Sequence, residues 1–89
     1  MRIEFDTAKN ERNIRERGLS FEQAAEFDFE TARIETDDRH DYGEPRMTAI
    51  GKLKGSLHVL VFTMRGEALR VISLRKANER EVRRYEQAA

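Results

Sequence analysis

Hydrophobic and polar positions alternate along much of the second half of the chain. A repeat of two residues is typical of β-strands that bury one face. Three segments separated by short glycine-containing turns suit strands: residues 46–53 and 68–75, whose side chains we assign alternately to two faces, and residues 56–64, which are apolar nearly throughout. Strands joined by such turns pair as hairpins, so the pattern predicts a three-stranded antiparallel meander. The middle segment is the most apolar, and we expect it to be the central strand.

Weaker patterns in the first half predict two edge strands and a helix. Residues 2–5 and residues 32–36 suit short strands. Residues 7–17 contain no helix breaker, and they lie between Asp6, a favourable N-cap, and Gly18, a favourable helix-ending residue. We therefore expect a helix that begins after Asp6 and ends before Gly18.

Two capping patterns predict two further helices. Ser20 and Gln23 form an S-x-x-Q pattern at the start of a short helix over residues 21–27. Asn78 and Glu81 form an N-x-x-E pattern at the start of a final helix. The inner stripe of that final helix is expected to contain Val82, Tyr85 and Ala89.

The order of these elements and the length of the chain favour one small domain over residues 1–89. We expect an α+β fold with a small antiparallel sheet, made of the meander plus edge strands, two N-terminal helices and one C-terminal helix. The absence of cysteine excludes a disulfide scaffold, a thiolate zinc site and a cysteine nucleophile. No apolar stretch approaches the roughly 20 residues of a membrane helix, and the N-terminus is acidic where a signal peptide is apolar. We expect a soluble cytoplasmic protein.

The formal net charge is zero, with 17 basic and 17 acidic residues. The two halves of the chain differ strongly, however. Residues 1–45 contain seven basic and thirteen acidic residues, whereas residues 46–89 contain ten basic and four acidic residues. Neutrality excludes a uniformly basic nucleic-acid binder, but an asymmetry of −6 against +6 indicates a site for a polyanion in the second half.

Three cations gather near the end of the last predicted strand: Arg70, Arg75 and Lys76. The N-terminus of the final helix follows them, and its free backbone N–H groups favour an anion. Arginine presents a planar fork that matches phosphate oxygens. One interpretation is therefore a phosphodiester clamp, and the other is ion pairing with Glu79, Glu81 or acids of the first half.

Three further side chains allow a functional and a structural interpretation. Lys9 opposes the dipole of the first helix, so it has either an external partner or a salt bridge to an acid such as Glu4. His58 on the central strand is either a general base or, as we favour, a partly buried hydrogen-bonded residue. Tyr85 faces inward from the final helix, but its hydroxyl is able to reach the cationic end of the sheet.

Residues 37–44 combine His40 with three aspartates, as a metal site would. We interpret this polar segment instead as a solvated loop with ion pairs. No metal ion and no cofactor are expected.

Motifs spread along the whole chain resemble those of the BrnT family. The N-terminal motif consists of Phe5, Asp6, Lys9, Asn13, Gly18, Ser20, Phe21, Glu22 and Ala25. The middle and C-terminal motifs are Asp41-Tyr42-Gly43-Glu44-x-Arg46, Ile50-Gly51 and Arg70-Val71-Ile72-Ser73-x-Arg75-Lys76-Ala77, followed by Glu81 and Tyr85. The resemblance implies a RelE-like fold and a toxin of a bacterial type II toxin–antitoxin pair, which cuts RNA and blocks translation. It also implies a BrnA-like antitoxin with a ribbon-helix-helix segment, which forms a hetero-oligomer with the toxin, brings it to operator DNA and represses the operon with it.

On this resemblance we expect a metal-independent ribonuclease in which the RNA 2′-hydroxyl attacks the adjacent phosphorus. The candidate catalytic residues are Arg75, Arg70, Tyr85 and Lys9, and the candidate RNA-binding residues are Lys76, Arg80 and Arg83. No residue is assigned as the general base. The alternative is a non-catalytic adaptor that binds nucleic acid through its basic half and a protein through its acidic half.

Overall fold

The computed structural model describes residues 1–39 and 41–88. The elements in chain order are β1 (Arg2–Glu4), α1 (Thr7–Arg17), the 3₁₀ helix η1 (Phe21–Glu26), β2 (Arg33–Asp37), β3 (Arg46–Leu53), β4 (Ser56–Arg65), β5 (Ala68–Lys76) and α2 (Glu79–Gln87). The predicted position of Ala89 on the inner stripe of α2 lies outside the described residues. No helix within the described ranges is long and apolar enough to cross a membrane.

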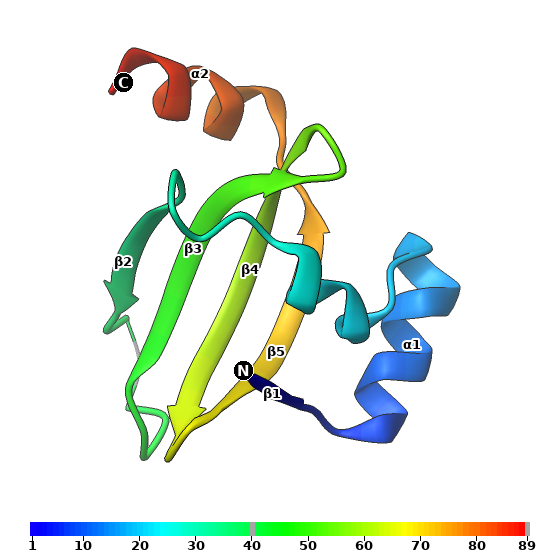
Figure 1. Cartoon of the computed structure of the whole chain (residues 1–89). Coiled ribbons are helices and arrows are strands. Elements are labelled where there is room, and N and C mark those ends of the chain that lie inside the picture. The colour runs from blue at the N-terminus through cyan, green and yellow to red at the C-terminus, as the bar shows by residue number, and fades with distance from the viewer. Residues whose placement is uncertain (40, 89) are drawn as a thin grey trace.

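The strands of the described chain form one sheet in the order β1-β5-β4-β3-β2 (Figure 1). Neighbours from β2 to β5 are antiparallel, so the antiparallel part of the sheet has one strand more than the predicted meander. β1 pairs with β5 in parallel, and the sheet is therefore mixed rather than antiparallel. A hairpin turn makes the two strands that it joins antiparallel. No such turn joins β1 to β5, which lie far apart in the sequence, so their pairing is free to be parallel.

η1 covers one face of the sheet and supplies much of the core (Figure 1). Phe21, Ala24 and Phe27 are buried and spaced three residues apart, so a helix with three residues per turn places all of them on the same side. This explains why the second predicted N-terminal helix is a short 3₁₀ helix. Gly51 on β3 makes room for this layer, because a Cβ atom there would lie 2.7 Å from Cζ of Phe27.

A bulge in β5 changes which residues share a face of the sheet. Val61 of β4 pairs with Ser73, but Phe62 pairs with Val71, so Ile72 is an extra residue in β5. As a result Leu69, Val71 and Leu74 all belong to the core. Strict alternation predicts Leu74 on the face opposite to Leu69 and Val71, and the bulge makes that prediction wrong.

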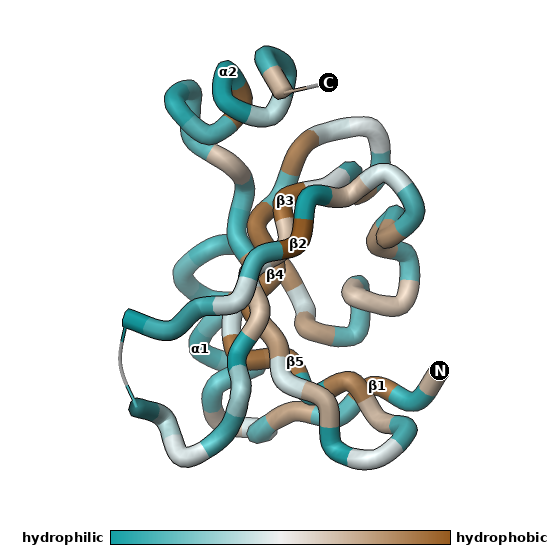
Figure 2. Tube along the Cα trace, turned by 90° about the vertical axis from the view of Figure 1, so that its left-hand side faces the viewer, coloured by the Kyte–Doolittle hydropathy of each residue, from teal (hydrophilic) through white to brown (hydrophobic). Residues whose placement is uncertain are grey.

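The same bulge brings Arg70 and Arg75 onto one face. Strict alternation assigns these two residues to opposite faces as well. Their pairing partners on β4, Thr63 and Val59, lie on the side of the sheet away from η1. We call this side, with Arg70, Ser73 and Arg75 of β5, the second face. α2 lies beyond one end of the sheet and is mostly hydrophilic, whereas the strands carry the apolar positions (Figure 2).

Candidate functional site

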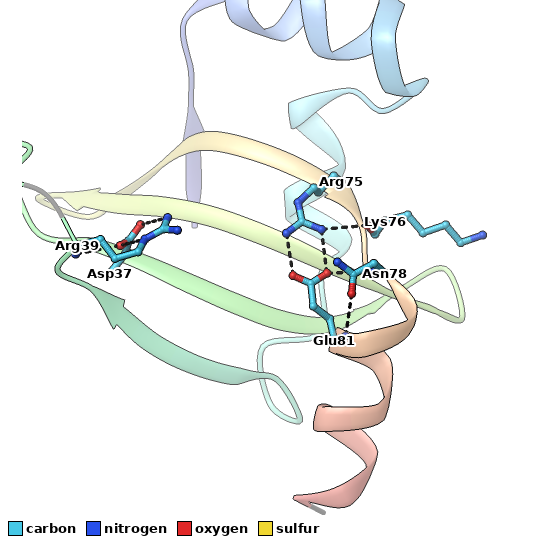
Figure 3. A network of polar contacts seen from close by, with 6 residues as sticks. All are labelled: Asp37, Arg39, Arg75, Lys76, Asn78 and Glu81. Atoms are coloured by element: carbon cyan, nitrogen blue, oxygen red, sulfur yellow. Dashed lines mark hydrogen bonds and ion pairs between the residues drawn. The ribbon is translucent and has the colours of Figure 1, made fainter.

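Arg75 and Glu81 form a two-pronged ion pair where β5 leads into α2 (Figure 3). Nη1 and Nη2 of Arg75 donate to Oε1 and Oε2 of Glu81, each at 2.8 Å. Glu81 also accepts from the backbone N–H of Asn78 at 2.9 Å, and Asn78 Oδ1 accepts from the Glu81 N–H at 2.8 Å. The predicted capping box of α2 and the ion pair are thus one network, and Arg75 has the intramolecular partner that one of our two interpretations expects.

The ion pair favours the charged forms of both Arg75 and Glu81. The hydrogen bonds from Arg75 are the main cause that lowers the pKa of Glu81 from 4.5 to about 2, and the Asn78 backbone and the positive charge of Arg75 add to it. The pKa of Arg75 is raised by the same hydrogen bonds. Both groups are therefore ionised at neutral pH, and an anion that binds Arg75 has to compete with Glu81.

The three cations that the sequence places together do not form one cluster. Lys76 of β5 lies opposite His58 of β4 in the strand pairing, on the core side of the sheet. Its side chain extends away from Arg75 (Figure 3). Successive residues of a strand point to opposite faces, which separates these two neighbours. Arg70 shares the second face with Arg75 but lies five residues away, which is roughly 15 Å along a strand.

A small hollow of about 100 Å³ lies between α2 and the second face. Its lining comprises Arg33, Glu35, Thr48, Ile50, Glu81, Arg84 and Tyr85. The Tyr85 hydroxyl donates to the carbonyl oxygen of Thr31 at 2.9 Å and so holds α2 near β2. Arg33, Glu35 and Arg84 are functional candidates that the sequence analysis missed. Alternation along β2 would have placed Arg33 and Glu35 on one face, but not beside α2.

The hollow brings two arginines and a tyrosine together, and such side chains bind a phosphodiester, whereas the carboxylates of Glu35 and Glu81 in the same lining oppose an anion. The other two candidates on α2 lie outside it. Arg80 and Arg83 are exposed, and Arg83 Nη1 lies 4.0 Å from Glu79 Oε2. They are accessible to a backbone phosphate but do not contact the network around Arg75.

Lys9 lies in a second hollow, of about 190 Å³, between α1 and β5. Glu4, its expected alternative partner, pairs instead with Arg2 at 3.0 Å. Within residues 1–39 and 41–88, Lys9 forms no ion pair and no side-chain hydrogen bond. The salt bridge between Lys9 and Glu4 that we considered is therefore not formed, and Lys9 lies at a place separate from Arg75.

His58 is buried, with 8% of its surface exposed, on the core side of the sheet. Its Nδ1 donates to the carbonyl oxygen of Ser56 at 2.9 Å. Val59, and not His58, shares a face with Arg75. The geometry matches the structural interpretation of His58.

The polar loop after β2 has the ion pairs expected of it. Arg39 forms a two-pronged pair with Asp37, at 2.9 and 3.1 Å, which lowers the pKa of Asp37 (Figure 3). No group of three or more potential metal ligands gathers among the residues that the structure describes. His40, which the metal interpretation needs, lies outside these residues.

Comparison with known proteins gives two agreeing matches. Residues 5–81 match the family described as the ribonuclease toxin BrnT of type II toxin–antitoxin systems. A crystal structure of the Brucella abortus ribonuclease toxin BrnT superposes with a TM-score of 0.71 and 31% sequence identity, over 89% of this chain and 99% of that one. No curated protein matches the sequence.

Proposed function

Because the chain belongs to the BrnT family of ribonuclease toxins of type II toxin–antitoxin systems, we propose that it is a metal-independent endoribonuclease that inhibits translation in the cytoplasm. The observation that carries this proposal is the position of Arg75. It lies on the second face of the sheet, beside a hollow that is lined by two further arginines and by Tyr85. Such a site supplies hydrogen-bond donors for the charge that develops on a phosphoryl group.

In the proposed reaction the 2′-hydroxyl oxygen of RNA bonds to the adjacent phosphorus, and the bond from phosphorus to the 5′-oxygen breaks. The products are a 2′,3′-cyclic phosphate and a 5′-hydroxyl. Arg75 stabilises the charge on the phosphoryl oxygens, and a well-placed donor of this kind contributes about 2.7–4 kcal/mol. Arg70, roughly 15 Å away along β5, acts on a neighbouring phosphate of the RNA. Tyr85 orients the 2′-hydroxyl or protonates the leaving oxygen, for which its hydroxyl has to leave the carbonyl oxygen of Thr31. Overall one proton passes from the 2′-oxygen to the 5′-oxygen, so a phenol that gives up its proton regains one from the 2′-hydroxyl.

The remaining candidates act on the RNA backbone around the scissile bond. Lys9 and Lys76 screen its phosphates, and Arg80 and Arg83 contact it from the exposed side of α2. For Arg75 to act, a phosphate has to replace Glu81 in the ion pair. That exchange replaces one charged acceptor by another, so the hydrogen bonds lost to Glu81 are regained on the phosphate.

A BrnA-like antitoxin with a ribbon-helix-helix segment neutralises the toxin in this proposal. The two proteins form a hetero-oligomer, which binds operator DNA through the antitoxin alone and represses the operon. Co-expression tests this part directly, because the antitoxin is expected to restore growth and to copurify with the chain. A neighbouring antitoxin that neither binds the chain nor restores growth would refute it.

The nuclease is tested with Arg75→Ala and the matched control Arg39→Ala. Both substitutions remove an arginine from a two-pronged carboxylate pair, but Arg39 lies at the other end of β2, away from α2. Arg75→Ala is expected to slow the appearance of new 5′-hydroxyl ends on RNA about 10²–10³-fold, whereas Arg39→Ala cleaves like the parent. Equal cleavage by Arg75→Ala and the parent, with equal folding, would rule out the clamp.

Two further outcomes separate the alternatives. Cleavage is expected to persist in excess EDTA, and its complete loss there would replace the proposed mechanism by a metal-dependent one. RNA binding by the parent without any new 5′-hydroxyl ends would support the non-catalytic adaptor instead.

A further inference from the structure

The hollow between α1 and β5, which we call the α1 groove, is separate from the site around Arg75. Its lining comprises Lys9, Arg12, Asn13, Glu16, Arg17, Phe21 and Ile72. The α1 residues among them recur every three or four positions, so they share one side of the helix. From Lys9 to Arg17 the groove follows α1 for about 12 Å, at 1.5 Å per residue.

The cations of the α1 groove are poorly neutralised. Glu16 is the one acid in its lining, and it pairs with Arg12 at 3.3 Å. Lys9 has no partner within the described residues, and Arg17 has one long hydrogen bond, of 3.4 Å, to the side-chain oxygen of Asn13. This surplus of positive charge in the groove is notable because residues 1–45, to which α1 belongs, carry a net charge of −6.

The groove also adjoins the β5 strand that carries the proposed clamp. β1 pairs with β5 only as far as Arg70, and beyond that point α1 lies alongside the edge of the strand. Asn13 of α1 donates to the carbonyl oxygen of Leu74 at 2.9 Å across this edge. Ile72, the bulge residue, lines the groove, and the next residue, Ser73, belongs to the second face. A polyanion held by Arg70 and Arg75 reaches the α1 groove by crossing one strand.

We propose that the α1 groove binds the phosphate backbone of RNA beside the segment that is cleaved. This inference rests on the proposed function and extends it from one phosphodiester to a longer stretch of RNA. The chemistry favours phosphate over a protein partner, because protein interfaces have an apolar centre that is depleted of charge. Here three cations line the groove, and Phe21 is buried in the core.

The test measures binding of a fluorescent single-stranded oligonucleotide with 2′-O-methyl groups, which lacks the attacking hydroxyl and is not cleaved. The variant Lys9→Gln/Arg17→Gln is compared with Arg15→Gln, which removes a charge from another side of the same helix. Fluorescence anisotropy at several salt concentrations gives the dissociation constant and its salt dependence. All substituted residues are exposed, and a thermal melt checks that each variant folds like the parent.

We expect the double variant to bind about tenfold more weakly at low salt, and the slope of log K against log salt to fall by about 1.4, or about 0.7 for each lost phosphate contact. Arg15→Gln is expected to change binding less than twofold. An unchanged slope for the double variant, or an equal loss for Arg15→Gln, would overturn the proposal. Loss of antitoxin binding with unchanged RNA binding would overturn it too, and would assign the groove to the partner.

Cleavage by the parent protein tests the proposed function separately. A parent that creates no 5′-hydroxyl ends, but whose RNA binding depends on Lys9 and Arg17, refutes the nuclease and supports the groove. If the parent cleaves RNA and the variant Lys9→Gln/Arg17→Gln binds RNA as tightly as the parent, only the proposal for the groove is refuted.

Discussion

Arg75 has a structural role in the folded chain in addition to its proposed role with a ligand. Its guanidinium joins the end of β5 to the first turn of α2 through Glu81, and the same carboxylate completes the cap of that helix. In the proposed reaction a phosphate takes the place of this carboxylate. Glu81 is therefore both a structural partner of Arg75 and a competitor of the substrate, and its charge is open to direct test.

Glu81→Gln is expected to lower the free energy of unfolding at pH 7 by about 1 kcal/mol, a low value for charged hydrogen bonds because 36% of the Arg75 side chain is exposed. Glutamine still suits the third position of a capping box, so the loss reports mainly the charge. The pKa of Glu81 is lowered from 4.5 to about 2 in the folded chain, so its contribution is complete above about pH 4.5 and disappears as the pH falls towards 2.

Urea unfolding at several pH values between 7 and 2 measures this effect. The difference between parent and Glu81→Gln is expected to shrink as the pH falls through this window. Glu86→Gln, an exposed position on the same helix, serves as the control and is expected to stay within about 0.5 kcal/mol of the parent. A difference that stays constant down to pH 2 would contradict the assigned pKa.

At the scale of elements, α1 is attached by two asparagines rather than by an apolar stripe. Asn13 Nδ2 donates to the carbonyl oxygens of Leu19 and Leu74, both at 2.9 Å, and Asn10 Oδ1 accepts from the backbone N–H of Phe21 at 2.7 Å. Ile14, an apolar residue of α1, is 44% exposed. These polar bonds hold α1 without an apolar stripe, and Asn13 itself lies in the lining of the α1 groove, beside Lys9 and Arg17.

Asn13→Ala is expected to lower the free energy of unfolding by about 2 kcal/mol, because it removes both hydrogen bonds that Nδ2 donates and leaves the carbonyl oxygen of Leu74 without this buried donor. Arg15→Ala, at an exposed position on the same helix, is expected to change it by less than about 0.5 kcal/mol. Urea unfolding of both variants at pH 7 makes the comparison. Equal midpoints for Asn13→Ala and the parent would show that α1 is held in another way.

Most elements follow from local sequence signals, because they depend on residues that are near neighbours. The predicted helix between Asp6 and Gly18 has the observed bounds, and Asp6 caps it as expected, through Ala8. The predicted strand over residues 46–53 also has the observed bounds of β3. The bulge at Ile72 has no such signal, because it arises from the register between two strands.

At the scale of the whole molecule, stability is expected to differ between its parts. β4 is bonded on both sides, by β3 and by β5, and contains several core residues, whereas α2 contains no buried residue. Elements with little buried surface open locally at low cost, while central strands exchange their amide hydrogens only when the chain unfolds globally.

Hydrogen exchange followed by NMR or mass spectrometry tests this difference. Protection factors in α2 are expected to be at least about tenfold lower than in β4. α1, which is tied to β5 by Asn13, is expected to lie between them. Equal protection of α2 and β4 would contradict the view that α2 is held mainly by its first turn and by Tyr85.

The sequence by itself determined the strands, the caps of α1 and α2, the resemblance to a ribonuclease toxin family and the separation of charge between the two halves. These features depend on neighbouring residues, on motifs or on composition, and a single sequence shows all three. The tertiary structure alone decided that β1 runs parallel to β5, that Arg70 and Arg75 share a face while Lys76 does not, and that Arg75 meets Glu81. It also decided that Lys9 of the acidic half faces a groove beside β5. These outcomes depend on the register and pairing of segments far apart in the chain, and a pattern of near neighbours carries no record of them.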